Sequence, residues 1–211
     1  MREAGPRKAK GDFAALPYRE APALMQRLRA MDGTAARALE LAVLCAARTG
    51  EVIYAERREF DLDADTWTVP AARTKAKESH AVYLSERAIE IVKAQRGQDA
   101  RYLFPTTMPG REGKPLSNMA MLAALDRLDV RDRTTVHGLC RPTFSTWANE
   151  TGAARPDVIE ACLAHEESNR VRAAYNRADF AEERRALLAK WAQYLARPAA
   201  PVLAIDSVRS A

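Results

Sequence analysis

The hydrophobic pattern of this chain changes from a helical period to an alternating one between residues 60 and 84. Phe60–Leu62 and Thr66–Val69 alternate around a turn at 63–65, and His80–Leu84 has the same strand-like character. The segments on either side, such as the Ala- and Leu-rich Thr34–Ala47, carry apolar residues at helical spacing. We therefore predict a mainly α-helical domain with one small antiparallel β-sheet near residues 60–83, an α+β fold.

Capping residues and prolines predict where the helices begin. Thr34, Ser85 and Ser117 are expected N-caps, and Asp179 with Glu182 is expected to form a capping box. The last helix has one apolar face, which predicts core packing and consists of Leu187, Leu188, Trp191 and Leu195. The expected helices are Pro17–Met31, Thr34–Ala47, Ser85–Gln95, Asn118–Leu128, Arg141–Glu150, Pro156–His165, Asn169–Tyr175 and Asp179–Ala196.

Length and composition fit one globular domain with short tails. The chain has 211 residues, 47% of them hydrophobic, and it has no apolar run long enough for a transmembrane helix. We expect a basic arm or residual linker at 1–12, the domain at 13–197 and a flexible tail at 198–211. The net charge of +5 is consistent with a polyanionic partner. Three widely spaced cysteines argue against a disulfide scaffold and for a reducing compartment.

Candidate functional residues gather in a few short motifs. His137 and Arg141 stand one helical turn apart, just before an apolar helix whose start is set by Pro142, because proline is tolerated in the first turn of a helix. Arg48 ends an earlier apolar run, where a helix-terminal arginine facing the helix dipole is the simpler interpretation. Glu51 follows closely enough to hold Arg48 by a charge-assisted hydrogen bond.

Several further motifs, in a fixed order, identify the family that the chain resembles. They include residues 10–17 (KGDFAALP), 46–52 (AARTGEV), 115–118 (PLSN), 143–148 (TFSTWA), 163–165 (LAH) and 183–187 (ERRAL). From Lys10 to Leu195 the chain resembles the catalytic domain of tyrosine recombinases, specifically of prophage-type integrases. Because the motifs are separate and in order, together they are far more specific than any one of them.

The resemblance implies a set of catalytic residues and an activity. The activity is site-specific DNA recombination, in which strands are cleaved and rejoined through a 3′-phosphotyrosine intermediate. Residues matching the family's catalytic positions are Arg48, Lys75, His137, Arg141, His165 and the nucleophile Tyr175. Tyr194 is the only other candidate for the nucleophile in the C-terminal part of the sequence, and its place inside the last helix predicts core packing instead.

The chemistry explains why these residue types are needed. A tyrosine has a pKa near ~10, so its attack on a phosphodiester requires a base or a strongly positive site. Arg48 and Arg141 can grip the phosphate oxygens in a forked geometry and offset charge in the transition state. Lys75, on a hairpin turn, can protonate the leaving 5′ oxygen, and the two histidines can move the tyrosine proton or bind the phosphate.

The same resemblance implies the partners and the setting. The expected partner is double-stranded DNA, and the chain is expected to act as a homo-oligomer, a tetramer on DNA. No metal ion or other cofactor is required, no membrane is involved, and the protein is expected in the bacterial cytoplasm in association with the nucleoid.

The chain departs from the family pattern in several respects. The family's second arginine stands three residues after the histidine, where this chain has Cys140, and Arg141 follows it. Lys77 occupies a hairpin position that is usually glycine, which predicts a positive φ there. The arm-binding and core-binding domains of such integrases lie upstream of the matched region, so we expect weak, salt-sensitive DNA binding by this chain, whether it is a natural truncation or a fragment.

Two other interpretations stay open. The first is a truncated, catalytically impaired remnant of a prophage integrase that binds DNA or another partner. The second is a structural zinc site, because His137, Cys140, Cys162 and His165 form two ligand pairs at helix-compatible spacing.

Overall fold

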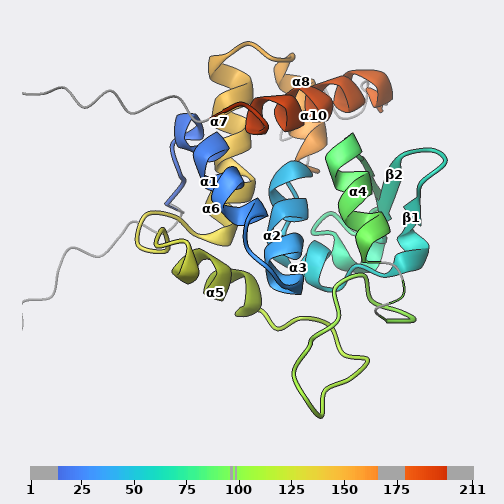
Figure 1. The fold of residues 1–211 in the computed structure, drawn as a ribbon. Helices are drawn as coiled ribbons and strands as arrows, with labels where there is room; N and C mark the ends of the chain where they lie inside the picture. The colour runs from blue at the N-terminus through green and yellow to red at the C-terminus, as the bar shows by residue number, and fades with distance from the viewer. Residues whose placement is uncertain (1–13, 96, 98, 166–178, 199–211) are drawn as a thin grey trace, which may run out of the picture.

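The computed structural model describes residues 14–95, 97, 99–165 and 179–198. Helices form most of this part of the chain, together with a three-stranded antiparallel sheet (Figure 1), so the predicted α+β fold is confirmed. The expected helix 169–175 lies outside the described residues. The helical elements are η1 (Tyr18–Glu20), α1 (Ala21–Arg29), α2 (Thr34–Leu44), α3 (Thr49–Ile53), η2 (Arg57–Glu59), η3 (Ala71–Arg73), α4 (Glu86–Ala94), α5 (Ala120–Arg127), α6 (Val136–Cys140), α7 (Pro142–Glu150), α8 (Pro156–Cys162) and α10 (Ala181–Leu195).

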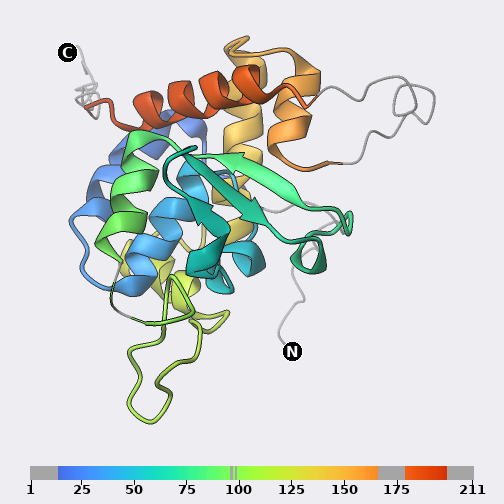
Figure 2. The same cartoon turned by 90° about the vertical axis from the view of Figure 1, so that its right-hand side faces the viewer.

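The sheet has the order β1 (Phe60–Asp61), β2 (Thr66–Val69) and β3 (His80–Tyr83). Trp67 on β2 is fully buried and stacks on its cross-strand partner Phe60, which fixes the face that β2 turns to the core. The turn between β2 and β3 projects at the side of the molecule where α8 ends (Figure 2). Lys77 in this turn has a φ of 58°, as its match to a glycine position predicted.

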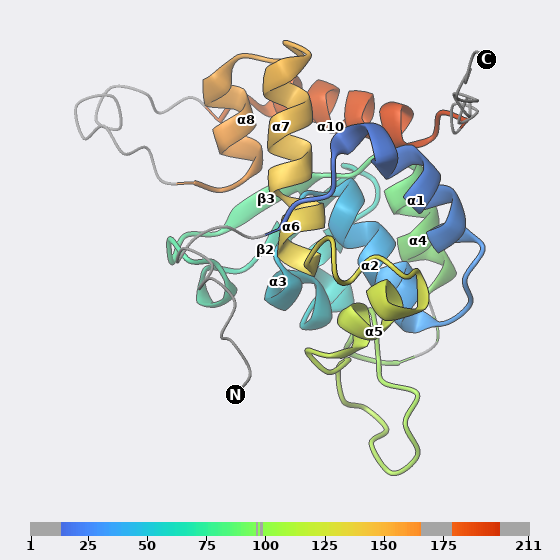
Figure 3. The ribbon, with the colours of Figure 1, turned by 90° about the vertical axis from the view of Figure 1, so that its left-hand side faces the viewer.

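Helix α2 is the centre of the core. Helices α1, α4, α5, α6 and α10 all contact it (Figure 3). Its side chains from Ala38 to Leu44 are buried. The predicted apolar face of α10 is confirmed, and its buried Trp191 also donates from Nε1 to the Val43 carbonyl at 2.9 Å. No helix in the described part of the chain is long and apolar enough to cross a membrane.

The predicted N-caps are right for one helix and wrong for two. Ser85 caps α4, because its Oγ accepts a hydrogen bond from the Ala88 amide. Thr34 is the first residue of α2 rather than its cap, and Gly33 takes the cap position with a φ of 102° that suits glycine. Ser117 does not cap α5, which begins later because the chain first makes a turn closed by the Ser117 carbonyl.

The capping box predicted for α10 is also wrong. Phe180, in a left-handed conformation, is the N-cap, and no side chain caps the helix. The Asp179 carboxylate instead accepts hydrogen bonds from Arg184 at 2.6 Å and from the Tyr83 hydroxyl at 3.2 Å. Arg184 is almost fully buried and also donates to the Ala81 carbonyl, so the start of α10 is tied to strand β3.

Gly138 permits a close crossing between α6 and the beginning of the described chain. A Cβ at this position would lie 2.0 Å from the Ala14 carbonyl oxygen, which is shorter than any real contact. The same oxygen accepts hydrogen bonds from the Thr135 amide and the Thr134 hydroxyl. The absence of a side chain at Gly138 therefore holds α6, and the residues on it, against this segment.

We expect Gly138→Ala to lower the free energy of unfolding by about 1–3 kcal/mol, because the added methyl group overpacks a backbone contact that cannot move freely. Urea denaturation measures the change. The matched control is Gly50→Ala in α3, where nothing lies within 4 Å of the new Cβ and stability should be unchanged or higher. Equal stability of the two variants would show that the Ala14 backbone can move away from the new methyl group at no cost.

Candidate active site

Arg48 reaches the site because α2 ends earlier than its apolar run. The helix stops at Leu44, Ala46 adopts a φ of 49°, and the Ala47 amide bonds back to the Ala42 carbonyl at 3.0 Å, the pattern of a Schellman motif. Arg48 follows in an extended conformation as the N-cap of α3. The interpretation of Arg48 as a residue facing the dipole at the end of its own helix is therefore wrong.

Glu51 holds Arg48, as predicted. One carboxylate oxygen of Glu51 lies 2.8 Å from the Arg48 guanidinium, and the other accepts from the Arg48 backbone amide, also at 2.8 Å. Glu51 is 3% exposed, so this ion pair is shielded from water and fixes the direction of the guanidinium.

Arg141 stands at the junction of two helices. Thr135 caps α6 by accepting from the Gly138 amide, and Pro142 opens α7 as the sequence predicted. The Arg141 side chain is buried and donates to the carbonyls of Ala46 at 3.0 Å and Leu163 at 2.5 Å. Burial and the charge of nearby Arg48 lower the pKa of Arg141 to about 10, which leaves it charged at neutral pH.

His165 lies next to Arg141. Helix α8 ends at Cys162, and Ala164 with a φ of 46° turns the chain so that His165 follows. Its Nε2 is 2.8 Å from Nη2 of Arg141, and its Nδ1 is 2.6 Å from a carboxylate oxygen of Glu160. Arg48 also reaches this helix end, with Nη2 at 3.4 Å from the carbonyl oxygens of Leu163 and Ala164.

His137 belongs to the same group of side chains. Burial lowers the pKa of His137, and the positive charges of Arg141 and Arg48 and the nearby His165 lower it further. The neutral form is therefore favoured, which is the form able to accept a proton. Four of the six residues predicted for the site thus gather at one place.

The other two predicted residues are Lys75 and Tyr175. Lys75 is exposed on the turn between β2 and β3 and forms no hydrogen bond or ion pair with the described site residues. Tyr175 lies outside the described residues. The other candidate, Tyr194, is half-buried and packs against the core, stacked on Trp191, with its hydroxyl donating to the Tyr18 carbonyl at 3.2 Å.

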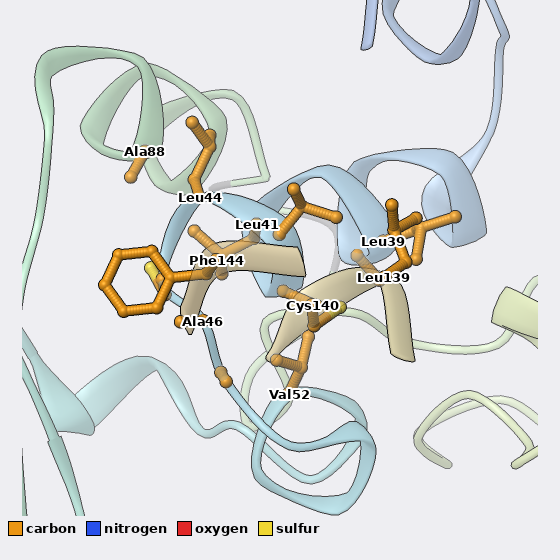
Figure 4. Packing of buried hydrophobic residues seen from close by; sticks show 14 of the residues in the cluster. Leu39, Leu41, Leu44, Ala46, Val52, Ala88, Leu139, Cys140 and Phe144 are labelled. Carbon is orange, nitrogen blue, oxygen red and sulfur yellow. The ribbon is translucent and has the colours of Figure 1, made fainter. Parts of the chain in front are cut away.

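Cys140 faces the core and not the site. It is fully buried beside α2 and α3, among side chains such as Leu39 and Val52 (Figure 4), and burial raises the pKa of its thiol. Within the described residues, which include all four proposed zinc ligands, no group of three or more His, Cys, Asp or Glu side chains is arranged to hold a metal ion. The zinc interpretation therefore lacks a ligand cluster.

Sequence reasoning missed two residues around the site. Glu160 contacts His165, and its position on α8 before the Leu-Ala-His motif was the only signal available. His80, on β3, bonds to the Cys162 backbone, and the charges of Arg184, Glu51 and Arg48 act on its pKa. The sequence pattern predicts only a strand at this residue.

Comparison with known proteins identifies the family. Residues 15–182 match the Phage integrase family. The chain belongs to this family. Among curated relatives, this integrase-family chain is similar to prophage integrase IntA of Escherichia coli (strain K12), at 38% identity over 152 residues, covering 71% of this chain and 36% of IntA. Prophage integrase IntZ of the same strain is 38% identical over 184 residues, covering 86% of this chain and 45% of IntZ.

The match to an integrase of Enterobacteria phage P4 is 32% identical over 204 residues and covers 87% of this chain and 45% of that integrase. The chain thus spans less than half the length of each of these relatives. Among solved structures, the integrase from mycobacterium phage Brujita superposes with a TM-score of 0.62 at 19% identity, covering 93% of this chain and 66% of that one. The XerA recombinase gives 0.55 at 16% identity, covering 92% and 66%. These two structures share the fold.

We expect the integrase fold to lose stability as the pH falls from about 6.5 towards 4, in part because of His80. Burial, followed by the charge of Arg184, lowers the pKa of His80 to about 4 from an ordinary 6.5. Since the unfolded chain binds this proton first, the contribution of His80 is fully present above pH 6.5 and is lost as the pH falls through that range, by up to about 1.4 kcal/mol per pH unit.

Urea denaturation at several pH values measures this effect, and His80→Asn is the test variant because asparagine does not titrate. Carboxylates titrate in both proteins, so the difference between the two pH profiles reports on His80. Parallel profiles between pH 6.5 and 4 would show that His80 is not buried in its neutral form.

Proposed function

We propose that this chain is the catalytic part of a tyrosine recombinase, a DNA strand transferase that cleaves and rejoins DNA through a 3′-phosphotyrosine intermediate. The observation that carries the proposal is the meeting of Arg48 and Arg141 at the end of α8, next to His165. Two guanidinium groups so close together repel each other, and an arrangement of this kind is favoured when a phosphate binds between them.

In the proposed reaction, Tyr175 Oη attacks the phosphorus atom of a DNA phosphodiester. The bond to the 5′ oxygen breaks, and Lys75 supplies the proton that this oxygen takes. Arg48 and Arg141 neutralise the charge that grows on the non-bridging oxygens, an effect worth about 3 kcal/mol per donor. His137, favoured in its neutral form, is suited to accept the tyrosine proton.

The position of Cys140 supports Arg141 as the second arginine. The extra residue before Arg141 is accommodated by the core, where Cys140 is fully buried, and the Arg141 guanidinium is in contact with His165. Double-stranded DNA is the proposed substrate, and assembly into a tetramer on DNA is part of the same proposal.

A nicked suicide DNA substrate tests this function, with a denaturing gel to detect a covalent protein–DNA product. Candidate attachment sites flanking the gene supply the DNA. We expect a covalent band with the wild type and none with Tyr175→Phe. Arg141→Lys should slow cleavage by about 10²–10³-fold, because lysine cannot reproduce the forked contact with phosphate.

The matched control is Arg133→Ala, which removes an arginine whose guanidinium is bound to Glu20 instead, and it should leave the cleavage rate nearly unchanged. Folded wild-type protein that binds the DNA but forms no covalent band would favour the alternative of an impaired, DNA-binding remnant. A band that survives Tyr175→Phe would assign the nucleophile to another residue.

A further inference from the structure

Three side chains form a continuous chain of contacts at the end of α8. The carboxylate of Glu160 lies 2.6 Å from Nδ1 of His165, and Nε2 of His165 lies 2.8 Å from Nη2 of Arg141. Glu160 and His165 are about half exposed, with side-chain exposures of 52% and 44%, whereas Arg141 is buried. The chain of contacts therefore leads from the surface to the buried guanidinium.

The contact with Arg141 fixes which nitrogen of His165 carries a proton. A guanidinium only donates hydrogen bonds, so Nε2 must accept with its lone pair. The proton of the neutral imidazole is then on Nδ1, where it is donated to the Glu160 carboxylate. In the free protein, His165 is thus held in one tautomer by partners on both sides.

Arg141 has no free pair of parallel N–H groups in this arrangement. One hydrogen on Nη2 is donated to the Leu163 carbonyl and the other to His165. A guanidinium has two pairs of parallel N–H groups, Nε with Nη2 and Nη1 with Nη2, and both pairs include Nη2. A phosphate that binds to either pair must therefore displace one of these partners. The His165 side chain is the partner that can move, because the Leu163 carbonyl is part of a helix end.

We propose that Glu160 is a positioning residue that allows His165 to exchange its contact with Arg141 for a contact with a bound phosphate. This rests on the proposed function, since the phosphate is that of the DNA substrate. On binding, Nε2 takes up one proton from solvent and donates it to a phosphate oxygen, while Arg141 turns the released N–H to the same phosphate. Both nitrogens of His165 then donate, one to phosphate and one to Glu160.

The charges around His165 explain why Glu160 is needed. The Arg141 guanidinium touches the imidazole at 2.8 Å, and the Arg48 guanidinium reaches the carbonyl of the preceding residue, Ala164, so both positive charges oppose a positive charge on His165. Glu51 is neutralised by its own ion pair with Arg48. Glu160 is the carboxylate in direct contact with His165 within the described residues, so it stabilises the imidazolium together with the incoming phosphate.

The ¹⁵N chemical shifts of the histidine rings test this directly, because the chain has three histidines and each tautomer has its own pattern. In free protein at neutral pH, His165 should carry its proton on Nδ1. Addition of the nicked duplex used for the cleavage assay should convert it to the imidazolium. In Glu160→Gln, His165 should stay neutral with the same DNA bound.

The matched control is Glu183→Gln, which makes the same change of charge at another half-exposed carboxylate, one that is paired with Arg155. It should behave as the wild type in the histidine spectra. Cleavage by Glu160→Gln should be roughly tenfold slower, with DNA affinity equal to that of the control variant. Glu160→Asp, which keeps the charge, should recover part of the rate.

The proposal is overturned if His165 becomes charged equally in wild type and Glu160→Gln, or if it stays neutral in wild type with DNA bound. Failure of the proposed function looks different. In that case no Tyr175-dependent covalent band forms, while the histidine spectra still respond to DNA and to Glu160→Gln.

Discussion

The buried guanidinium of Arg141 is the interaction on which the site depends. Its hydrogen bonds to the carbonyls of Ala46 and Leu163 join the ends of α2 and α8, two helices far apart in the sequence. A helix end exposes carbonyl groups without partners and carries partial negative charge, so it suits an arginine. The same residue thus links the core helix α2 to the helix that carries His165.

The two helix ends that Arg141 joins are built alike. Each finishes with an alanine in the left-handed region, Ala46 after α2 and Ala164 after α8, with the following amide bonded back into the helix. Glycine is the usual residue at such positions, since a Cβ adds strain. In this chain, alanines with this backbone strain stand at the two points where the chain turns to present Arg48 and His165. Strained backbone of this kind is common at functional sites.

The sequence predicted most of the fold and part of the site. The change of hydrophobic period located the sheet, and the apolar faces of α2 and α10 are buried as expected. Helix starts were predicted less well, because a polar side chain near a helix end has competing partners. Asp179 is an example: its carboxylate binds Arg184 and Tyr83 in place of the helix amides.

The sequence by itself determined the family, the order of the candidate residues and the ion pair of Arg48 with Glu51, because these depend on local spacing. Only the tertiary structure decided that Arg141 reaches the site although Cys140 stands before it. The break between α6 and α7 directs Cys140 to the core and Arg141 to the end of α8. The contacts of Glu160 and His80 were also decided by packing, since they join elements whose relative positions no local pattern encodes.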